Sequence, residues 1–311
     1  MDRDDLPRQG RILVRNEWSG INYKDALAVT GKGKIIRSSL PFVPGIDMAG
    51  TVVESGSEHF QEGDRVLATG WGIGEEHWGG YSEYQWLDEA WLLPIPDSLS
   101  TRNAMIVGTA GFTAMLSVLE LEQQGLPPGS GDFLVTGATG GVGSFAVMLL
   151  SQLGFDVTAA TGKPQAHEYL RSLGATNFIS RDVLSEGALR PLDRGRWAGC
   201  VDSVGSTTLE AVLSCTKRHG VVAACGLAGG HELNTTVFPF ILRGVRLIGI
   251  DSNTCPMADR KIAWSRLADL SQTRDLGEIA HEVKLEDIPS ACDTLMSGGI
   301  MGRYVVRLKS A

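Results

Sequence analysis

Apolar and polar positions follow two different patterns along this chain. In the first hundred residues, short apolar runs such as 43–47 and 49–53 are broken by Gly and Pro, and residues 11–15 alternate as a strand does. Residues 22–29 have the Asn start and the apolar spacing of a short helix. We therefore predict a small, mainly antiparallel β domain with inserted loops in this part of the chain.

From about residue 101 the apolar spacing becomes helical, and strand-like and helix-like segments then alternate. Strands are predicted at 132–136, 156–161, 177–180, 199–203, 220–225 and 246–251, and helices at 105–122, 141–153, 165–173 and 207–216. The tail adds a helix over 260–270 and a strand over 302–307. Alternation of this kind predicts an α/β fold, with a doubly wound parallel sheet covered by helices on both faces.

Composition narrows the class of protein. With 311 residues, 43% of them hydrophobic and 21% charged, the chain is not a disordered, collagen-like or coiled-coil protein. A net charge of −8 argues against nucleic-acid and membrane-surface partners, and glycines interrupt the apolar stretch 133–155, which is otherwise long enough to span a bilayer. The polar, acidic N-terminus is not a signal peptide, and five cysteines without C-x-x-C spacing favour a reduced, cytoplasmic setting.

The most specific local signal is a glycine-rich turn between a predicted strand and a predicted helix. Its glycines are spaced three apart, with Ala138 after the first of them, so the loop departs from the usual G-x-G-x-x-G pattern. Glycine there permits a tight turn, close approach of a pyrophosphate to backbone amides and close packing of helix on strand. We predict a dinucleotide-binding loop consisting of Gly137, Gly140, Gly141, Val142, Gly143 and Ser144.

The end of the next predicted strand indicates which dinucleotide is bound. An NAD site presents Asp or Glu about 20 residues after the glycine loop, whereas this chain has Thr161, Gly162 and Lys163 there. A carboxylate would repel a 2′-phosphate, while a hydroxyl, an amide and an ammonium bind it. Arg181, after the following strand, adds a second positive charge. We predict NADP(H) as cofactor; a solvated surface lysine at position 163 is the alternative.

The first half of the chain lacks the residues of a catalytic zinc site. Catalytic zinc takes Cys, His or carboxylate ligands around an open position. Residues 1–199 contain no Cys, and His59 and His77 do not have ligand spacing. We therefore predict a reaction that uses no metal.

Segments spread over nearly the whole chain carry a family resemblance. They include Asn22-Tyr-Lys-Asp-Ala-Leu, Pro44-Gly-Ile-Asp-Met-Ala-Gly50, His77-Trp-Gly-Gly80, Gly108-Thr-Ala-Gly-Phe-Thr-Ala114, the glycine loop, Ala223-Ala-Cys-Gly-Leu-Ala-Gly-Gly230 and Phe238-Pro-Phe-Ile-Leu-Arg243. Together they resemble the zinc-free, quinone-oxidoreductase-like branch of the medium-chain dehydrogenase/reductases, and within it the acrylyl-CoA reductase group. The zinc-containing branch has a ligand cysteine where this chain has Asn22, and a His-Glu pair where it has Ile46 and Asp47.

This resemblance implies a domain organisation and an activity. A Rossmann domain over 108–252 would be inserted into a GroES-like catalytic domain over 1–107 and 253–311, and the protein would be a homodimer. The implied reaction is NADPH-dependent reduction of the carbon–carbon double bond of acrylyl-CoA to propionyl-CoA. Hydride on the β-carbon leaves an enolate, whose oxygen needs hydrogen-bond donors and whose α-carbon needs a proton. An NADPH:quinone oxidoreductase and a non-catalytic NADPH-binding protein remain as alternatives.

The resemblance also places the helix that begins at Asn22 beside the nicotinamide. We predict Tyr23 as the hydrogen-bond donor or proton source, Asn22 as an orienting amide, and Asp25 as a partner of one of them or of the cofactor. The alternative is that Asn-x-x-Asp is an ordinary helix start. Further contacts on the nicotinamide side are carried over to Ala26, Leu227, Ile241, Ser252 and Arg303.

Candidate substrate contacts lie in two loops. Lys32, Lys34 and Arg37 form a short basic loop in an acidic chain, which predicts contact with the phosphates of a small-molecule CoA thioester; a solvated turn is the alternative. Trp71 and Trp78, in a glycine-rich segment, are predicted to line the substrate cleft, and the alternative is that they pack.

Overall fold

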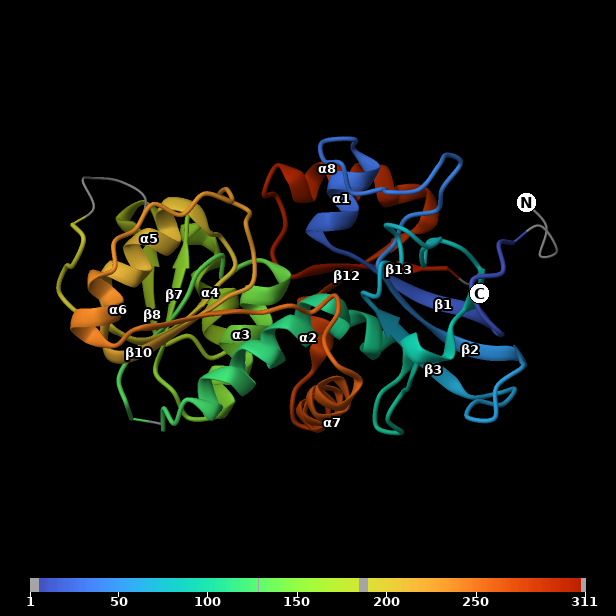
Figure 1. The fold of residues 1–311 in the computed structure, drawn as a ribbon, viewed down its shortest axis with the longest axis horizontal. Helices are drawn as coiled ribbons and strands as arrows, with labels where there is room; N and C mark the ends of the chain where they lie inside the picture. Colours follow the sequence, from blue (N-terminus) through green and yellow to red (C-terminus); the bar gives the residue numbers. More distant parts are fainter. Residues whose placement is uncertain (1–5, 128, 185–189, 309–311) are drawn as a thin grey trace. The chain divides into compact units, whose positions relative to one another are not determined.

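The computed structural model describes three stretches of the chain, residues 6–127, 129–184 and 190–308. Within them the chain forms two compact units (Figure 1). The first unit takes the chain up to Phe112 and again from Ser252, and the second unit takes Thr113–Asp251. The predicted domain boundaries, after 107 and after 252, lie close to this division in the sequence.

The first unit is built on a seven-stranded sheet. Its strands, in sheet order, are β12 (Ala280–Lys284), β13 (Arg303–Arg307), β1 (Ile12–Ile21), β2 (Asp47–Ser55), β3 (Arg65–Thr69) and β5 (Leu93–Pro94), with β4 (Tyr84–Leu87) also paired to β1. Every described pair is antiparallel except β12 with β13, which confirms the predicted mainly antiparallel domain. Ile12 and Val14, two residues apart and so on one face of β1, pack with Met48 and Val66 in a buried cluster.

Helices complete the first unit. They are α1 (Tyr23–Val29), α7 (Met257–Thr273), α8 (Ile288–Met296) and the first part of α2 (Thr101–Gln123). α1 packs against α8, with Ala26, Ile288 and Ala291 buried in one cluster. Asn22 has an extended backbone at the start of α1, and its N–H donates to the Asp25 carboxylate, so the helix predicted over 22–29 forms with the expected cap.

Helix α2 is interrupted at Gly108, where φ is +45° and ψ is −157°. The helix predicted over 105–122 is therefore two helical segments joined by a kink. Among the described helices, α2 is long and apolar enough to cross a membrane, but 83% of its most apolar window is buried, as in the core helix of a folded protein.

The second unit has a six-stranded parallel sheet. Its strands, in sheet order, are β11 (Arg246–Gly249), β10 (Thr216–Ala224), β9 (Trp197–Asp202), β6 (Phe133–Val135), β7 (Val157–Thr161) and β8 (Asn177–Ser180). Its helices are α3 (Gly141–Gln152), α4 (His167–Ser172), α5 (Ser206–Cys215) and α6 (Phe238–Arg243). Short 3-10 helices of the two units lie at Glu89–Trp91, Pro164–Ala166, Arg181–Leu184, Leu276–Ile279 and Leu285–Asp287.

The strand order confirms the predicted doubly wound sheet. From β6 the chain runs outward through β7 to β8, and β9 then starts on the other side of β6 and leads through β10 to β11. Because parallel crossovers are right-handed, helices from the two halves cover opposite faces. The loops after β6 and β9 meet at the carboxyl edge, the usual place for a ligand in such a sheet.

Candidate active site

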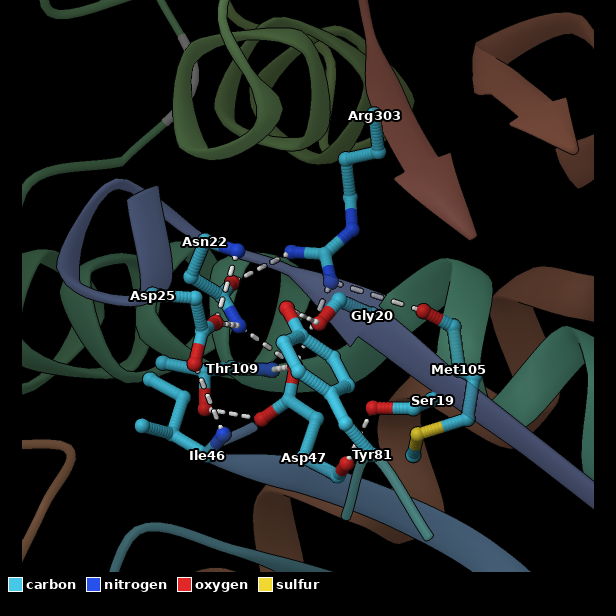
Figure 2. A network of polar contacts seen from close by, with 10 residues as sticks. All are labelled: Ser19, Gly20, Asn22, Asp25, Ile46, Asp47, Tyr81, Met105, Thr109 and Arg303. Carbon is cyan, nitrogen blue, oxygen red and sulfur yellow. Dashed lines mark hydrogen bonds and ion pairs between the residues drawn. The ribbon is translucent and has the colours of Figure 1, made fainter. Parts of the chain in front are cut away.

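A buried polar network occupies the first unit where the start of α1 meets β2 and β13 (Figure 2). The Asn22 amide nitrogen donates to an Asp47 carboxylate oxygen at 2.9 Å and to an Asp25 oxygen at 3.1 Å. The Asn22 amide oxygen accepts from Arg303 Nη1 at 2.9 Å, and Arg303 Nη2 lies 3.3 Å from Asp47 Oδ2. Asp25, Asp47 and Arg303 are almost completely buried. The network therefore joins the half-buried amide of Asn22 to two acids and one cation that are shielded from bulk water.

The kink in α2 completes the surroundings of Asp47. Thr109 donates its backbone N–H to Asp47 Oδ2 at 2.9 Å and its hydroxyl to Oδ1 at 2.5 Å. A break in a helix leaves the next N–H groups without helical acceptors, so the Thr109 N–H is available to the carboxylate. A Cβ at Gly108 would collide with Asp47 and with Arg303, and only glycine adopts this positive φ without strain. The kink thus belongs to the site.

Asp25 titrates near neutral pH. Its Oδ1 accepts from the Ile46 N–H at 2.9 Å, and its Oδ2 accepts from the Asn22 N–H at 2.9 Å. Burial and then the charge of Asp47 raise the pKa of Asp25 from 3.8 to about 7, although the hydrogen bonds from Asn22 and Ile46 lower it. Asp25 can therefore exchange a proton under physiological conditions.

Tyr81 and Arg303 each keep one charge state. Burial raises the pKa of Tyr81 well above its usual value, and its hydroxyl donates to the Gly20 carbonyl at 3.2 Å, so it stays a neutral phenol. Burial lowers the pKa of Arg303, while Asp47 and Asp25 raise it and so favour its cationic form. Arg303 is thus the positive charge that balances the two acids.

We expect the free energy of unfolding to fall as pH rises from about 4 to about 7 on account of Asp25. Its pKa is 3.8 when unfolded and about 7 when folded, so the folded state holds more protons across this window. The contribution reaches at most about 1.4 kcal/mol per pH unit. Urea unfolding of the wild type and of Asp25→Asn, from about pH 4 to about pH 7, measures this change in the free energy of unfolding. Asp97→Asn, at an exposed position, is the control. Equal slopes for the wild type and Asp25→Asn would contradict the assignment.

The network is unsuited to a metal ion. Within the stretches that the structure describes, no group of three or more His, Cys, Asp or Glu could hold one. At the positions where the zinc-containing branch carries ligands, Asn22 and Asp47 bind each other and Arg303. The guanidinium of Arg303 already supplies the positive charge beside Asp47, and it would repel a second cation.

The other predicted residues of α1 lie outside this network. Tyr23 is 38% exposed, so part of this residue is accessible to a small molecule. Ala26 is fully buried in the cluster between α1 and α8. The catalytic role of Tyr23 and the cofactor contact of Ala26 stay predictions.

The glycine loop of the second unit has the geometry of a pyrophosphate cradle. Gly137 has a φ of +56°, and a Cβ there would lie 2.5 Å from Ser203 Oγ. A Cβ at Gly143 would overlap the Gly137 carbonyl, so the helix can approach the turn only without a side chain. Gly140 is the N-cap of α3, and Gly141, Val142, Gly143 and Ser144 form its first turn. The N–H groups of that turn are the donors that bind phosphate in such folds.

Ser144 contributes to packing within the loop. It is completely buried, its hydroxyl donates to the Ala138 carbonyl at 3.4 Å, and it accepts from the Tyr169 hydroxyl at 2.8 Å. Its backbone N–H donates to the Gly140 carbonyl at 2.8 Å. A direct contact between the Ser144 side chain and the cofactor stays a prediction.

Two cations meet at the end of β7. The Thr161 hydroxyl accepts from the Lys163 N–H at 3.0 Å. A Cβ at Gly162 would lie 2.7 Å from Arg181 Nε, so the Arg181 side chain covers this glycine. Partial burial and the Arg181 charge lower the pKa of Lys163, which places the two cations within electrostatic reach of each other. Asp182 lies 3.9 Å from Arg181 Nε. The two cations fit a phosphate better than a ribose diol.

The remaining predicted cofactor contacts lie in several elements. Leu227 and Ile241 are exposed at 55% and 68%, so both are accessible. The Ser252 carbonyl accepts from Arg260 Nη2 at 2.9 Å. Arg303 belongs to the buried network described above. Their contacts with the nicotinamide stay predictions.

The basic loop is exposed and partly neutralised. Lys32 and Lys34 are exposed, whereas Arg37 Nη1 lies 3.0 Å from Glu76 Oε1. The loop therefore offers two lysines to an anion, with Arg37 held by an acid. Contact with CoA phosphates stays a prediction.

The two tryptophans are held by packing and backbone contacts. Trp71 has a φ of +59°, packs against the apolar cluster of β1 to β3, and lies under Arg260, whose guanidinium carbon is 4.5 Å from the ring. The carbonyl of half-buried Trp78 accepts from Gln9 at 3.2 Å and from Gln85 at 2.5 Å. These contacts favour the packing interpretation, and the substrate contact stays a prediction.

Sequence reasoning did not select Asp47, Thr109 or Tyr81 as site residues. The sequence did contain an indication of Asp47, because Asp47 is the one charged residue in the apolar run 43–53. The indication of Thr109 was weaker: the preceding residue, Gly108, is unfavourable inside a helix and so suggests a break there. Tyr81 had none.

Comparison with known proteins identifies the family. Residues 8–97 match the alcohol dehydrogenase GroES-like domain and residues 141–270 match the zinc-binding dehydrogenase domain. The chain is 50% identical to the probable acrylyl-CoA reductase AcuI of Escherichia coli K12 (99% of this chain, 94% of the relative) and 49% identical to acrylyl-CoA reductase AcuI of Ruegeria pomeroyi (97% and 91%). It is 48% identical to the putative quinone oxidoreductase YhfP of Bacillus subtilis (98% and 92%).

Solved structures agree with these relatives. The yhdH oxidoreductase of Salmonella enterica in complex with NADP has a TM-score of 0.95 and 50% identity, covering 99% of this chain and 94% of that one. The Bacillus subtilis protein yhfP with NAD bound has a TM-score of 0.94 and 47% identity, covering 99% and 93%. The resemblance drawn from the sequence is thus confirmed: the chain belongs to the medium-chain dehydrogenase/reductase family and, within it, to the acrylyl-CoA reductase group.

Proposed function

We propose that this chain is an NADPH-dependent reductase of acrylyl-CoA, which it converts to propionyl-CoA without a metal ion. The observation that carries the proposal is the sequence identity of 50% and 49% to two acrylyl-CoA reductases over nearly the whole chain. The paired cations Lys163 and Arg181 support NADP(H) as the cofactor, as does the NADP complex of the Salmonella enterica relative.

The two units supply different parts of this activity. NADPH supplies the hydride when bound. In the second unit, the first-turn N–H groups of α3 would hold the pyrophosphate, and Thr161, Lys163 and Arg181 would hold the 2′-phosphate. These residues fit the group because the glycines leave room for it and the two cations match its charge.

In the first unit, the hydroxyl of Tyr23, a residue that is 38% exposed, is proposed as a donor to the thioester oxygen of the substrate. Asn22 fixes the start of α1, because its amide is held by two acids and Arg303. Asp25 accepts from the Asn22 N–H and, with a pKa of about 7, stores a proton next to that helix end.

The test is anaerobic NADPH oxidation with acrylyl-CoA, crotonyl-CoA, acrolein and a simple benzoquinone. We expect kcat/KM to be highest for acrylyl-CoA, with propionyl-CoA as the product. A kcat/KM for the quinone equal to or above that for the ester would overturn the proposal. No oxidation with any acceptor would favour a non-catalytic NADPH-binding protein.

Quinone reduction is the second candidate. It is favoured by the 48% identity to the putative quinone oxidoreductase of Bacillus subtilis, which is nearly that of the acrylyl-CoA reductases. The exposed lysines Lys32 and Lys34 favour the CoA ester, because a simple quinone has no phosphates for them to bind.

A homodimer is part of the same proposal. β11 is the edge strand of the parallel sheet, and next to it in the chain Val237, Phe238 and Leu242 are exposed at 61%, 44% and 49%. Two copies related by a two-fold axis can pair their edge strands and bury these side chains against each other. An edge strand beside exposed apolar side chains is otherwise a risk for uncontrolled association.

We expect Val237→Asp to yield monomers under conditions in which the wild type is a dimer, because the substitution would bury an unpaired carboxylate at the contact. Sedimentation velocity measures the change. Ile262→Asp, at a position on α7 that is 53% exposed, is the matched control and should stay dimeric. A monomeric wild type at micromolar concentration would contradict the dimer.

The proposed setting is the cytoplasm. All five cysteines lie in the described part of the chain, and all are free thiols. Thiols stay reduced in that compartment, whereas an oxidising compartment favours disulfides.

A further inference from the structure

Asp202, the last residue of β9, is a buried acid that the proposed reaction does not use. One carboxylate oxygen accepts from the Thr136 hydroxyl at 2.6 Å, and the other accepts from the Gly205 N–H at 2.8 Å. Burial raises the pKa of Asp202, and these two hydrogen bonds lower it, so they favour the carboxylate form. A buried carboxylate is costly unless it is hydrogen-bonded, and Asp202 accepts from these two donors.

The first partner leads directly to the glycine loop. Thr136 immediately precedes Gly137 in the chain. Its hydroxyl also accepts from the Ser203 N–H at 3.1 Å, and its carbonyl accepts from the Ser203 hydroxyl at 3.1 Å. The turn that is proposed to hold the pyrophosphate is therefore fastened, through Thr136, to the segment that follows Asp202.

The second partner leads to the loop after β10. Gly205 has a φ of +74°, and a Cβ there would lie 2.6 Å from the Gly230 carbonyl. The Cys225 N–H donates to the Asp202 carbonyl at 2.8 Å, and the Gly229 N–H donates to Val204 at 2.8 Å. The loop over 225–230, which carries the predicted nicotinamide contact Leu227, is thus held by the same segment.

We propose that Asp202 is a positioning residue that holds the glycine loop and the 225–230 loop at a fixed separation, and thereby sets the affinity for the dinucleotide. The inference rests on the proposed use of NADP(H). Loops that are ordered before the ligand arrives lose less conformational freedom on binding, so affinity is higher. Because both loops are proposed to contact parts that NADPH and NADH share, we expect Asp202 to act on both dinucleotides equally.

The experiment measures Kd for NADPH and NADH in variants of the full chain. Thr136→Val removes the donor to Asp202 at nearly constant volume, and we expect both Kd values to rise about tenfold. Asp202→Ala removes the acceptors, and we expect a rise of about 100-fold. Thr136→Ser retains the hydroxyl and should restore both Kd values to within about twofold of the wild type.

Thr176→Val is the matched control. The Thr176 hydroxyl donates to the carbonyl of Val157, the first residue of β7, at the amino edge of the sheet and away from the glycine loop. Its Kd values should equal those of the wild type. If Asp202→Ala does not fold, the comparison of Thr136→Val with Thr136→Ser still tests whether the hydrogen bond to Asp202 sets the dinucleotide affinity. Unchanged affinity in folded Thr136→Val would overturn this inference alone, as would a loss confined to NADPH. A wild type that binds neither dinucleotide would overturn the proposed function as well.

Discussion

Replacing Arg303 with methionine is expected to destabilise the protein by about 3–5 kcal/mol, the usual cost of removing one partner of a buried ion pair. The substitution would leave Asp25 and Asp47 buried without a positive charge, and Asp47 would lose the partner that now lies 3.3 Å away. The amide oxygen of Asn22 would lose its donor as well. Guanidinium unfolding at pH 7 measures the loss.

A second variant separates electrostatics from packing. In Arg303→Met with Asp47→Asn, one uncompensated charge is removed, so we expect part of the lost stability to return. Arg307→Met, at the exposed end of the same strand, is the matched control and should stay within about 0.5 kcal/mol of the wild type. A loss below about 1 kcal/mol in Arg303→Met would show that the pair does not balance the two acids.

Replacing Lys163 with alanine is expected to weaken NADPH binding about 10–100-fold and to leave NADH binding within about twofold. A hydrogen bond to a charged group contributes about 1.5–3 kcal/mol, and NADH lacks the 2′-phosphate that would accept it. Arg181→Ala should act in the same direction, because its side chain covers Gly162 beside the same site. Fluorescence titration with both dinucleotides gives the two affinities.

Lys217→Ala is the control for a general loss of positive charge in the second unit. Lys217 lies at the start of β10, at the amino edge of the sheet, so neither affinity should change. Equal losses of NADPH and NADH binding in Lys163→Ala would contradict a 2′-phosphate site. The Bacillus subtilis relative with NAD bound makes this comparison informative, because close relatives are known with each dinucleotide.

Local patterns predicted the elements whose signals lie within one segment. The glycine loop needed only the spacing of Gly137, Gly140 and Gly143, and the start of α1 needed only Asn22 and Asp25 three residues later. The doubly wound sheet followed from alternating strand and helix periods, since few arrangements of parallel strands obey right-handed crossovers.

The contacts that build the site were not predictable in this way. Asp47 and Arg303 are 256 residues apart in the chain, and no spacing rule relates such positions. β12 is largely exposed and polar, and it is a strand because it pairs with β13. β1 runs on to Ile21, beyond the predicted 11–15, because β13 pairs with its second half. Tertiary pairing therefore overrides weak local preference in these elements.

The most direct test of the proposed reaction is the fate of the transferred hydrogen. Acrylyl-CoA would be reduced anaerobically with NADPH deuterated at both C4 positions, and the product would be analysed by mass spectrometry and NMR. The account predicts propionyl-CoA with one deuterium on the β-carbon and, when unlabelled NADPH is used in D₂O, one deuterium on the α-carbon. Deuterium from the cofactor on the α-carbon, or absence of propionyl-CoA while a benzoquinone is reduced, would contradict it.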